Sequence, residues 1–192
     1  MLEQINRANS EWDVIGFFDD GLEVNSSVDG LTVLGKIDAL NNFKEPLSVC
    51  VAIAEPEARS QVVSKILNQM ISFPVLIHPA CLSGARNNSF GQGCVITAGA
   101  ILTTGIELGD FCIINLTATI GHDVSLGSFC TVMPGCSISG NVSVGANTVV
   151  GTGSRIVQGI SIGCNCFVGA GAVVTKSFGD SKKIMGVPAR SI

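Results

Sequence analysis

Apolar residues recur at every sixth position through the second half of the chain. Each sixth residue from Phe90 to Val174 is apolar, which gives fifteen positions in unbroken register. The residue four positions after each of these is mostly small, and glycine often stands directly after the apolar residue. A period of six fits neither an amphipathic helix, with its period of 3.6, nor a long strand, with its period of two. It predicts a short strand followed by a tight corner, repeated along the chain.

Three such units complete one triangular coil, and stacked coils pair their strands in parallel at a spacing of about 4.8 Å. In this mainly β architecture, a parallel β-helix, the aliphatic residue fills the interior and the small residue lies inside each wall. The glycine after the aliphatic residue is expected to supply an unusual φ angle at the corner. The pattern assigns residues 76–178 to the β-helix and leaves 179–192 as a C-terminal tail.

The first 75 residues follow a different pattern. Apolar runs at 13–18, 47–54 and 74–77 predict buried strands, and segments 36–42 and 57–71 predict helices. Strands that alternate with helices favour a small parallel α/β sheet. The opening residues are typical of the end of a helix whose preceding strand is absent. We therefore expect residues 1–75 to form an incomplete, Rossmann-like domain.

Composition and charge narrow the function classes. Hydrophobic residues make up 46% of the chain and charged residues 14%, against an average charged share of about 25%, which argues against disorder. The net charge of −4 argues against nucleic-acid binding, which needs a basic face. No run approaches the roughly 18 consecutive apolar residues of a transmembrane helix, and the start lacks the regions of a signal peptide. We expect a cytoplasmic protein that binds neither nucleic acid nor membrane.

The eight cysteines suggest a disulfide framework, a metal site or a catalytic nucleophile. The six-residue register places five of them at the inward small position, where a reduced thiol packs as a compact hydrophobe: Cys94, Cys112, Cys130, Cys136 and Cys166. The others, Cys50, Cys81 and Cys164, lie off this register, and none belongs to a CxxC pair. Packing is therefore the favoured role, and no metal site is predicted.

Five short motifs point to one family. They are Gly-Phe-Phe-Asp-Asp at 16–20, Ile-His-Pro-Ala at 77–80, Ile-Gly-His-Asp at 120–123, Ser-Gly-Asn-Val at 139–142 and Met-Gly-Val-Pro-Ala at 185–189. With the hexapeptides, the chain resembles the left-handed β-helix acyltransferases, within them the bacterial sialic acid O-acetyltransferase and UDP-4-amino-sugar N-acetyltransferase group. The resemblance implies a left-handed coil and a homotrimer that binds acetyl-CoA between adjacent subunits. It also implies a small-molecule sugar acceptor, a place in surface polysaccharide biosynthesis, and no metal.

The resemblance also implies roles for individual residues. His122 matches the general base of the group, and Asp123 beside it is expected to orient the imidazole. Gly140 lies one 18-residue coil after His122, and its backbone N–H is expected to stabilise the oxyanion. The remaining matches are contacts with the acceptor, at Asn115, Asp19 and Asp20, and with CoA, at Gly151, Gly169, Ala170 and Pro188. Direct transfer between two bound substrates then needs no covalent intermediate.

A basic cluster and the second histidine have weaker assignments. The cluster either contacts the CoA phosphates or forms a solvated surface, and it comprises Lys176, Lys182, Lys183 and Arg190. His78 precedes Pro79 and is expected to be a structural corner at the junction of the two units.

One departure from the group leaves alternatives open. The group begins with a strand and a Gly-rich phosphate loop, but no glycine precedes Gly16 here, so this cradle of backbone N–H groups is expected to be missing. An inactive remnant and a non-catalytic β-helix scaffold remain alternatives to the enzyme. A zinc carbonic anhydrase with this solenoid needs three histidine ligands, and the chain has two histidines, 44 residues apart, so we exclude it.

Overall fold

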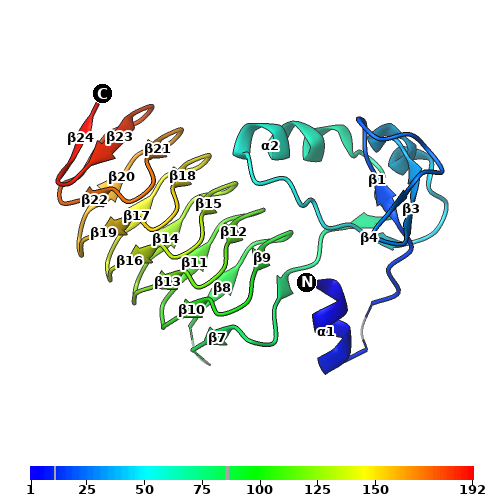
Figure 1. Cartoon of the computed structure of the whole chain (residues 1–192), viewed down its shortest axis with the longest axis horizontal. Helices are drawn as coiled ribbons and strands as arrows, with labels where there is room; N and C mark the ends of the chain where they lie inside the picture. Colours follow the sequence, from blue (N-terminus) through cyan, green and yellow to red (C-terminus); the bar gives the residue numbers. More distant parts are fainter. Residues whose placement is uncertain (11, 85–86) are drawn as a thin grey trace.

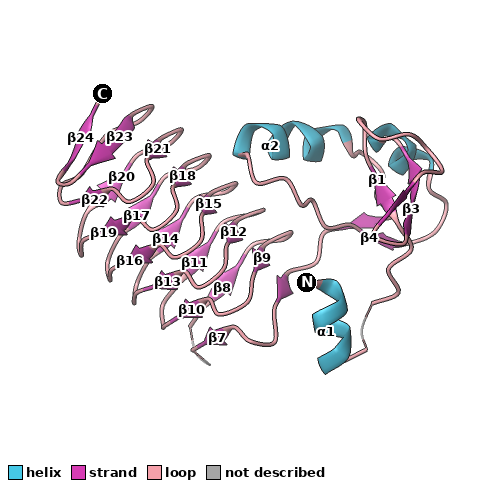
Figure 2. Cartoon of the chain, in the orientation of Figure 1, coloured by secondary structure: helices cyan, strands magenta, loops and turns pink. Residues whose placement is uncertain are grey.

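The computed structural model describes residues 1–10, 12–84 and 87–192. A small N-terminal unit lies beside one end of a long solenoid, and the C-terminus lies at the far end of that solenoid (Figure 1). Within the described residues, helices occur only in the N-terminal unit, whereas the solenoid consists of short strands and loops (Figure 2). None of the helices in these ranges is both long enough and apolar enough to span a bilayer.

Three sheets form the walls of the solenoid. The first contains β7 (Leu82–Ser83), β10 (Ile101–Leu102), β13 (Thr119–Ile120), β16 (Ser137–Ile138), β19 (Arg155–Ile156) and β22 (Val173–Val174). The second contains β8 (Ser89–Phe90), β11 (Glu107–Leu108), β14 (Ser125–Leu126), β17 (Ser143–Val144) and β20 (Ser161–Ile162). The third contains β6 (Leu76–Ile77), β9 (Val95–Ile96), β12 (Ile113–Ile114), β15 (Thr131–Val132), β18 (Val149–Val150), β21 (Phe167–Val168), β23 (Lys183–Gly186) and β24 (Ala189–Ser191). The predicted β-helix is confirmed.

Successive coils pair in parallel in the predicted register. Thr119 lies beside Ser137 and Ile120 beside Ile138, a step of 18 residues. The second residue of each strand is the six-fold aliphatic residue, and Ile120 is only 1% exposed. Because each inward aliphatic residue is followed by a corner, no strand from β6 to β22 is longer than two residues. The core is one continuous column of aliphatic and small side chains, held by burial of apolar surface.

The glycines that follow the aliphatic residues do not have the predicted conformation. Positive φ occurs two positions later instead, as at Gly93 (67°) and Asp123 (55°), and at none of the glycines directly after an aliphatic residue. A methyl group on Gly121 would lie 2.6 Å from the backbone nitrogen of Gly140 in the next coil. The expectation of unusual φ at these positions was wrong. Glycine is needed there because the stacked coils leave no room for a Cβ atom.

The N-terminal unit contains two small sheets, whereas the sequence predicted a single parallel one. In the first sheet, β1 (Phe17–Phe18) pairs in parallel with β3 (Leu31–Gly35), which pairs antiparallel with β2 (Ser27–Val28). In the second, β4 (Leu47–Ser48) pairs in parallel with β5 (Ile71–Ser72). The β2–β3 hairpin turns at Asp29 and Gly30, both at positive φ. Asp-Gly is a hairpin signal that the apolar pattern alone does not include.

The described helices are α1 (Leu2–Ala8), the 3-10 helix η1 (Ile37–Asn42) and α2 (Pro56–Lys65). The carboxylate of Glu55 caps α2 by accepting hydrogen bonds from its first backbone N–H groups. The helix ends at Lys65, because Ile66 is extended, and does not continue to residue 71 as predicted. The segment 74–77, predicted as the third strand of this unit, supplies β6, which pairs with β9 of the solenoid.

Arg59 fastens α2 to the solenoid. Its side chain is 1% exposed and donates hydrogen bonds to the carbonyl oxygens of Phe111 (2.9 Å) and Phe129 (2.7 Å), as well as to Oγ1 of Thr131 (3.0 Å). Burial lowers the pKa of the guanidinium group, whose charge is balanced by carbonyl dipoles instead of a carboxylate. These contacts fix the N-terminal unit against coils that lie more than 50 residues away in sequence.

Candidate active site

His122 and Asp123 form a hydrogen-bonded pair at the corner that follows β13. Nδ1 of His122 lies 2.9 Å from Oδ2 of Asp123, and the two side chains are 49% and 61% exposed. Adjacent residues of a strand point to opposite faces, but Asp123 has a positive φ of 55°, which turns its carboxylate back to the imidazole. A carboxylate that accepts the Nδ1 proton leaves Nε2 free to take a proton from a ligand.

Gly140 stacks directly on this imidazole. A methyl group at position 140 would lie 2.6 Å from Cε1 of His122 and 2.7 Å from Cδ2, so only glycine permits the observed ring position. The backbone of the two coils is tied next to this contact, where the Asn141 N–H donates to the His122 carbonyl oxygen (2.8 Å). The predicted proximity of Gly140 and His122 is therefore present in the structure.

The backbone N–H of Gly140 lacks a hydrogen-bond partner within the described part of the chain. Elsewhere, the corresponding corner N–H donates to a side chain of the next coil: Gln92 to Asp110 (3.1 Å), Asp110 to Ser128 (3.1 Å) and Cys164 to Asp180 (2.8 Å). Gly140 is itself buried, and a buried donor without a partner costs about 1–3 kcal/mol. Such a group is uncommon, and functional sites are one of the places where it occurs.

The predicted acceptor and CoA residues of the β-helix share another corner. Asn115, Gly151 and Gly169 all follow a strand of the third sheet directly and stack at multiples of 18 residues, whereas His122 follows the first sheet. The Asn115 side chain accepts a hydrogen bond from the backbone N–H of Leu116 (2.8 Å). A single chain therefore does not bring Asn115 to His122.

The remaining predicted CoA contacts lie at the C-terminal end of that corner. Ala170 is exposed and adjoins Gly169, where a methyl group would meet Cγ of Met185 at 3.0 Å. Pro188 is also exposed and follows a cis peptide bond with Val187. The basic cluster is solvent-exposed, with Lys176 against the ring of Phe178, 5.6 Å from its centroid. This region combines small residues with positive charge.

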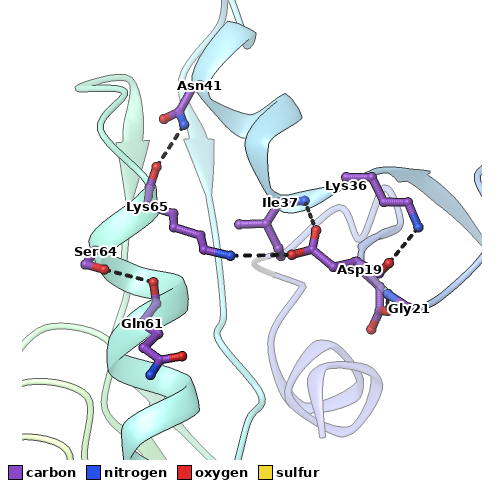
Figure 3. Close-up of polar contacts among 9 residues, drawn as sticks. Asp19, Gly21, Lys36, Ile37, Asn41, Gln61, Ser64 and Lys65 are labelled. Carbon is purple, nitrogen blue, oxygen red and sulfur yellow. Dashed lines mark hydrogen bonds and ion pairs between the residues drawn. The ribbon is translucent and has the colours of Figure 1, made fainter.

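Asp19 and Asp20 stabilise the turn that follows β1. Oδ1 of Asp19 accepts from the backbone N–H groups of Gly21 (2.7 Å) and Leu22 (3.0 Å). Oδ1 of Asp20 accepts from the backbone N–H of Ile37 (2.9 Å), and Oδ2 lies 3.8 Å from Nζ of Lys65. Figure 3 shows Lys65 reaching this turn from α2. Both carboxylates are far from His122 in the fold and lie at the rim of a cavity of about 630 Å³ in the N-terminal unit.

The cysteines and His78 have structural contacts. The thiols of Cys94, Cys112 and Cys130 donate to carbonyl oxygens one coil later, at 3.0–3.2 Å. All eight cysteines are free, and no metal-binding cluster of His, Cys, Asp or Glu occurs in the described ranges. Burial raises the pKa of Cys136, which opposes the thiolate form that a nucleophile needs. His78 is buried and accepts the Ala80 N–H at Nδ1 (2.9 Å).

Arg59 is a residue that the sequence reasoning missed. It lies on the predicted helix 57–71 and has no carboxylate partner in sequence proximity that would single it out. The one signal was its position among apolar residues of a helix expected to pack on the solenoid.

Two family models match the chain, one in each unit. The model of the PglD N-terminal domain matches residues 1–66. The model described as the hexapeptide repeat of succinyl-transferase matches residues 117–151 and 141–176. No curated protein matches the chain.

Solved structures match most of the chain. The acetyltransferase domain of PglB from Neisseria gonorrhoeae FA1090 is 31% identical, with a TM-score of 0.91, over 99% of this chain and 92% of that one. A histidine-to-asparagine variant of perosamine N-acetyltransferase from Caulobacter crescentus, solved with CoA and GDP-perosamine, is 30% identical. Its TM-score is 0.80, over 87% of this chain and 80% of that one. WeeI from Acinetobacter baumannii AYE is 26% identical, with a TM-score of 0.88, over 100% and 92%.

Proposed function

Because this chain belongs to the family of left-handed β-helix sugar acetyltransferases, we propose that it transfers an acetyl group from acetyl-CoA to the amine of a nucleotide-linked amino sugar. The PglB domain has been solved in complex with acetyl coenzyme A. The Caulobacter enzyme is an N-acetyltransferase solved with CoA and GDP-perosamine. These relatives support an amine acceptor, whereas the residues alone fit either an amine or a hydroxyl.

One observation carries the proposal: a carboxylate-oriented imidazole lies against a buried backbone N–H that has no partner in the described structure. A general base and an oxyanion donor are the two groups that acyl transfer from a thioester requires. His122 supplies the first and Gly140 the second. No nucleophilic side chain is needed, because the acceptor amine attacks directly.

The proposed reaction proceeds in two steps. The acceptor nitrogen attacks the thioester carbon, a C–N bond forms, and Nε2 of His122 takes the proton of the attacking amine. The carbonyl oxygen becomes an oxyanion that the Gly140 N–H stabilises. The C–S bond then breaks, the carbonyl re-forms, and the imidazolium returns its proton to the CoA sulfur. Asp123 stabilises the imidazolium throughout by accepting the Nδ1 proton.

The separation of the two corners supports a site shared between copies of the chain. His122 and Gly140 lie at one corner, and Asn115, Gly151 and Gly169 at another. In a cyclic homotrimer, one corner of a subunit faces another corner of its neighbour. We place acetyl-CoA along this junction, with the small residues at 151, 169 and 170 next to the pantetheine arm, Pro188 at its end, and the basic cluster near the phosphates.

The N-terminal unit is assigned to the acceptor. The carboxylates of Asp19 and Asp20 lie at the carboxyl end of β1, the end of parallel strands where α/β proteins bind ligands. Each retains an exposed surface that can accept hydrogen bonds from hydroxyl groups of a nucleotide sugar. We place the reaction in the cytoplasm, since free thiols suit a reducing compartment, with its product used for surface polysaccharide.

A subunit-mixing experiment tests the shared site. His122→Ala and Asn115→Ala chains, each expected to lose at least about tenfold in activity alone, are co-expressed in equal amounts and purified by two different tags. Random assembly leaves about one quarter of the sites with both wild-type residues, so about one quarter of wild-type activity should return. Activity no higher than the average of the single variants would place both residues in one chain's site or remove Asn115 from it.

A further inference from the structure

The two sheets of the N-terminal unit present open edges to one cavity. The apolar runs 13–18 and 47–54 each form only two residues of strand, β1 and β4. β1 is bonded on one side to β3, and β4 is bonded on one side to β5. Neither has a strand on its other side in the described chain. Residues of both runs line the cavity of about 630 Å³.

Backbone groups on the open side of each strand lack partners. The N–H groups of Leu47 and Val49 donate to the carbonyl oxygens of Met70 (3.0 Å) and Ser72 (2.8 Å). Alternate residues of a strand direct their backbone groups to opposite edges, so the N–H groups of Ser48 and Cys50 point away from β5. By the same alternation, the Asp19 N–H reaches Gly35 on β3 (3.0 Å), and the neighbouring Phe18 N–H points away from β3.

The direction of the strands matches across the cavity. β1 is parallel to β3 and β4 is parallel to β5, as in a doubly wound sheet. The commonest order of such a sheet, 3-2-1-4-5, has a central strand between the two halves. Strands lie about 4.8 Å apart, so one added strand can bond to both edges at once.

The lining of the cavity favours a peptide over a nucleotide. Its charged members are Asp13, Asp19 and Asp20, and no lysine, arginine or histidine lines it among the described residues. A phosphate group would meet carboxylates there without a compensating cation. An apolar strand instead buries its side chains against valine, isoleucine and leucine residues, and its backbone satisfies both open edges.

We propose that the cavity between β1 and β4 is a binding site for one extended, apolar peptide strand that runs parallel to both. The added strand joins the two small sheets into one continuous parallel sheet. Its alternate N–H and C=O groups bond to the Phe18 side of β1 and to the Ser48 side of β4. This site is separate from His122, so the inference does not depend on acetyl transfer.

Cys50 provides the readout, because it lines the cavity and is half-buried, and burial raises the pKa of its thiol. The full chain is mixed with the synthetic peptide Lys-Lys-Val-Ile-Val-Ile-Gly, and the rate of iodoacetamide alkylation at each cysteine is measured by mass spectrometry. At a peptide concentration ten times the Kd, alkylation of Cys50 should slow about tenfold. Alkylation of Cys164 on the solenoid should not change, since it lies away from the cavity.

Two controls separate strand pairing from nonspecific burial. A peptide with proline in place of both isoleucines lacks donors on one edge and should give no protection. Ser48→Pro removes a cavity-facing donor and should abolish protection, whereas Ser48→Ala, which equally loses the Ser72 contact, should retain it. If Ser48→Pro does not fold, amide exchange in the wild-type chain replaces it: the peptide should slow exchange at Ser48 more than at Val49, which is already bonded.

Several outcomes would overturn the proposal. These are the absence of protection, equal protection by the proline peptide, and protection that persists in folded Ser48→Pro. Protection of Cys50 by GDP alone would identify the cavity as a nucleotide site instead. Protection that grows with protein concentration without peptide would identify a second copy of the chain as the occupant.

Discussion

A methyl group at position 140 tests the geometry around His122 with the smallest possible change. In Gly140→Ala, the new carbon would lie 2.6 Å from Cε1 of the imidazole, whereas ordinary van der Waals contact begins at 3.4 Å. The ring must therefore move by about 0.8 Å, and a displacement near 1 Å costs on the order of 100-fold in rate. Gly140 has no positive φ, so alanine is tolerated by the backbone. The expected effect is a loss of about 100-fold in kcat/KM, or about 2.7 kcal/mol, with the fold intact.

The assay follows CoA thiol release from acetyl-CoA with a nucleotide-linked 4-amino sugar, and thermal unfolding is measured in parallel. Gly179→Ala is the matched control, because no atom lies within 4 Å of the added methyl and its φ is not positive. It should retain wild-type kcat/KM and Tm. If folded Gly140→Ala keeps activity within about threefold of wild type, the stacked imidazole is not the reacting group.

Three further variants test the parts that support this site. Asp123→Asn should lower kcat at least about tenfold with little change in KM, because the imidazolium loses its carboxylate; an unchanged kcat would exclude the pairing from catalysis. Arg59→Met should lower the urea midpoint by the equivalent of about 3 kcal/mol, since its carbonyl partners lose their donor, while the exposed Arg155→Met should be neutral; equal midpoints would refute this anchoring role. Ile120→Ala should cost about 2–5 kcal/mol of unfolding free energy, against little effect for Ile101→Ala, whose side chain is 40% exposed; similar losses would contradict the inward register.

The solenoid could be predicted because each six-residue unit repeats the same physical requirement. An inward aliphatic residue and a corner recur without insertion from Phe90 onward, so counting by 18 places Gly140 beside His122 before any coordinates are seen. The same count places Asn115 on another corner, since it precedes His122 by seven residues and not by a multiple of 18. That signal was present in the sequence and was not used.

The N-terminal unit was predicted less well because its elements depend on contacts distant in sequence. The run 47–54 has strand-like composition, yet only Leu47 and Ser48 find a neighbour in β5, since pairing requires a second edge. Helix α2 ends at Lys65 although apolar residues continue at helical spacing beyond it. The role of Arg59 depends on carbonyl groups of two coils, and a local pattern carries no record of them.

The glycine prediction failed for another reason. Sequence reasoning attributed the glycines after the aliphatic residues to backbone conformation, whereas contact between stacked coils requires them. Left-handed φ is instead adopted two positions later by residues such as Asp123 and Asn141. This conformation is what lets the Asp123 carboxylate reach the neighbouring imidazole.

The most direct test of the account is a transfer assay with purified protein, acetyl-CoA and a nucleotide-linked 4-amino sugar, read by mass spectrometry of the sugar. The account predicts one acetyl group per sugar, attached to nitrogen, with one CoA thiol released for each. In His122→Ala, the rate should fall by about 10²–10⁴-fold while acetyl-CoA binding and the oligomer remain unchanged. Wild-type turnover in His122→Ala, or transfer that never occurs despite bound acetyl-CoA and acceptor, would contradict the account.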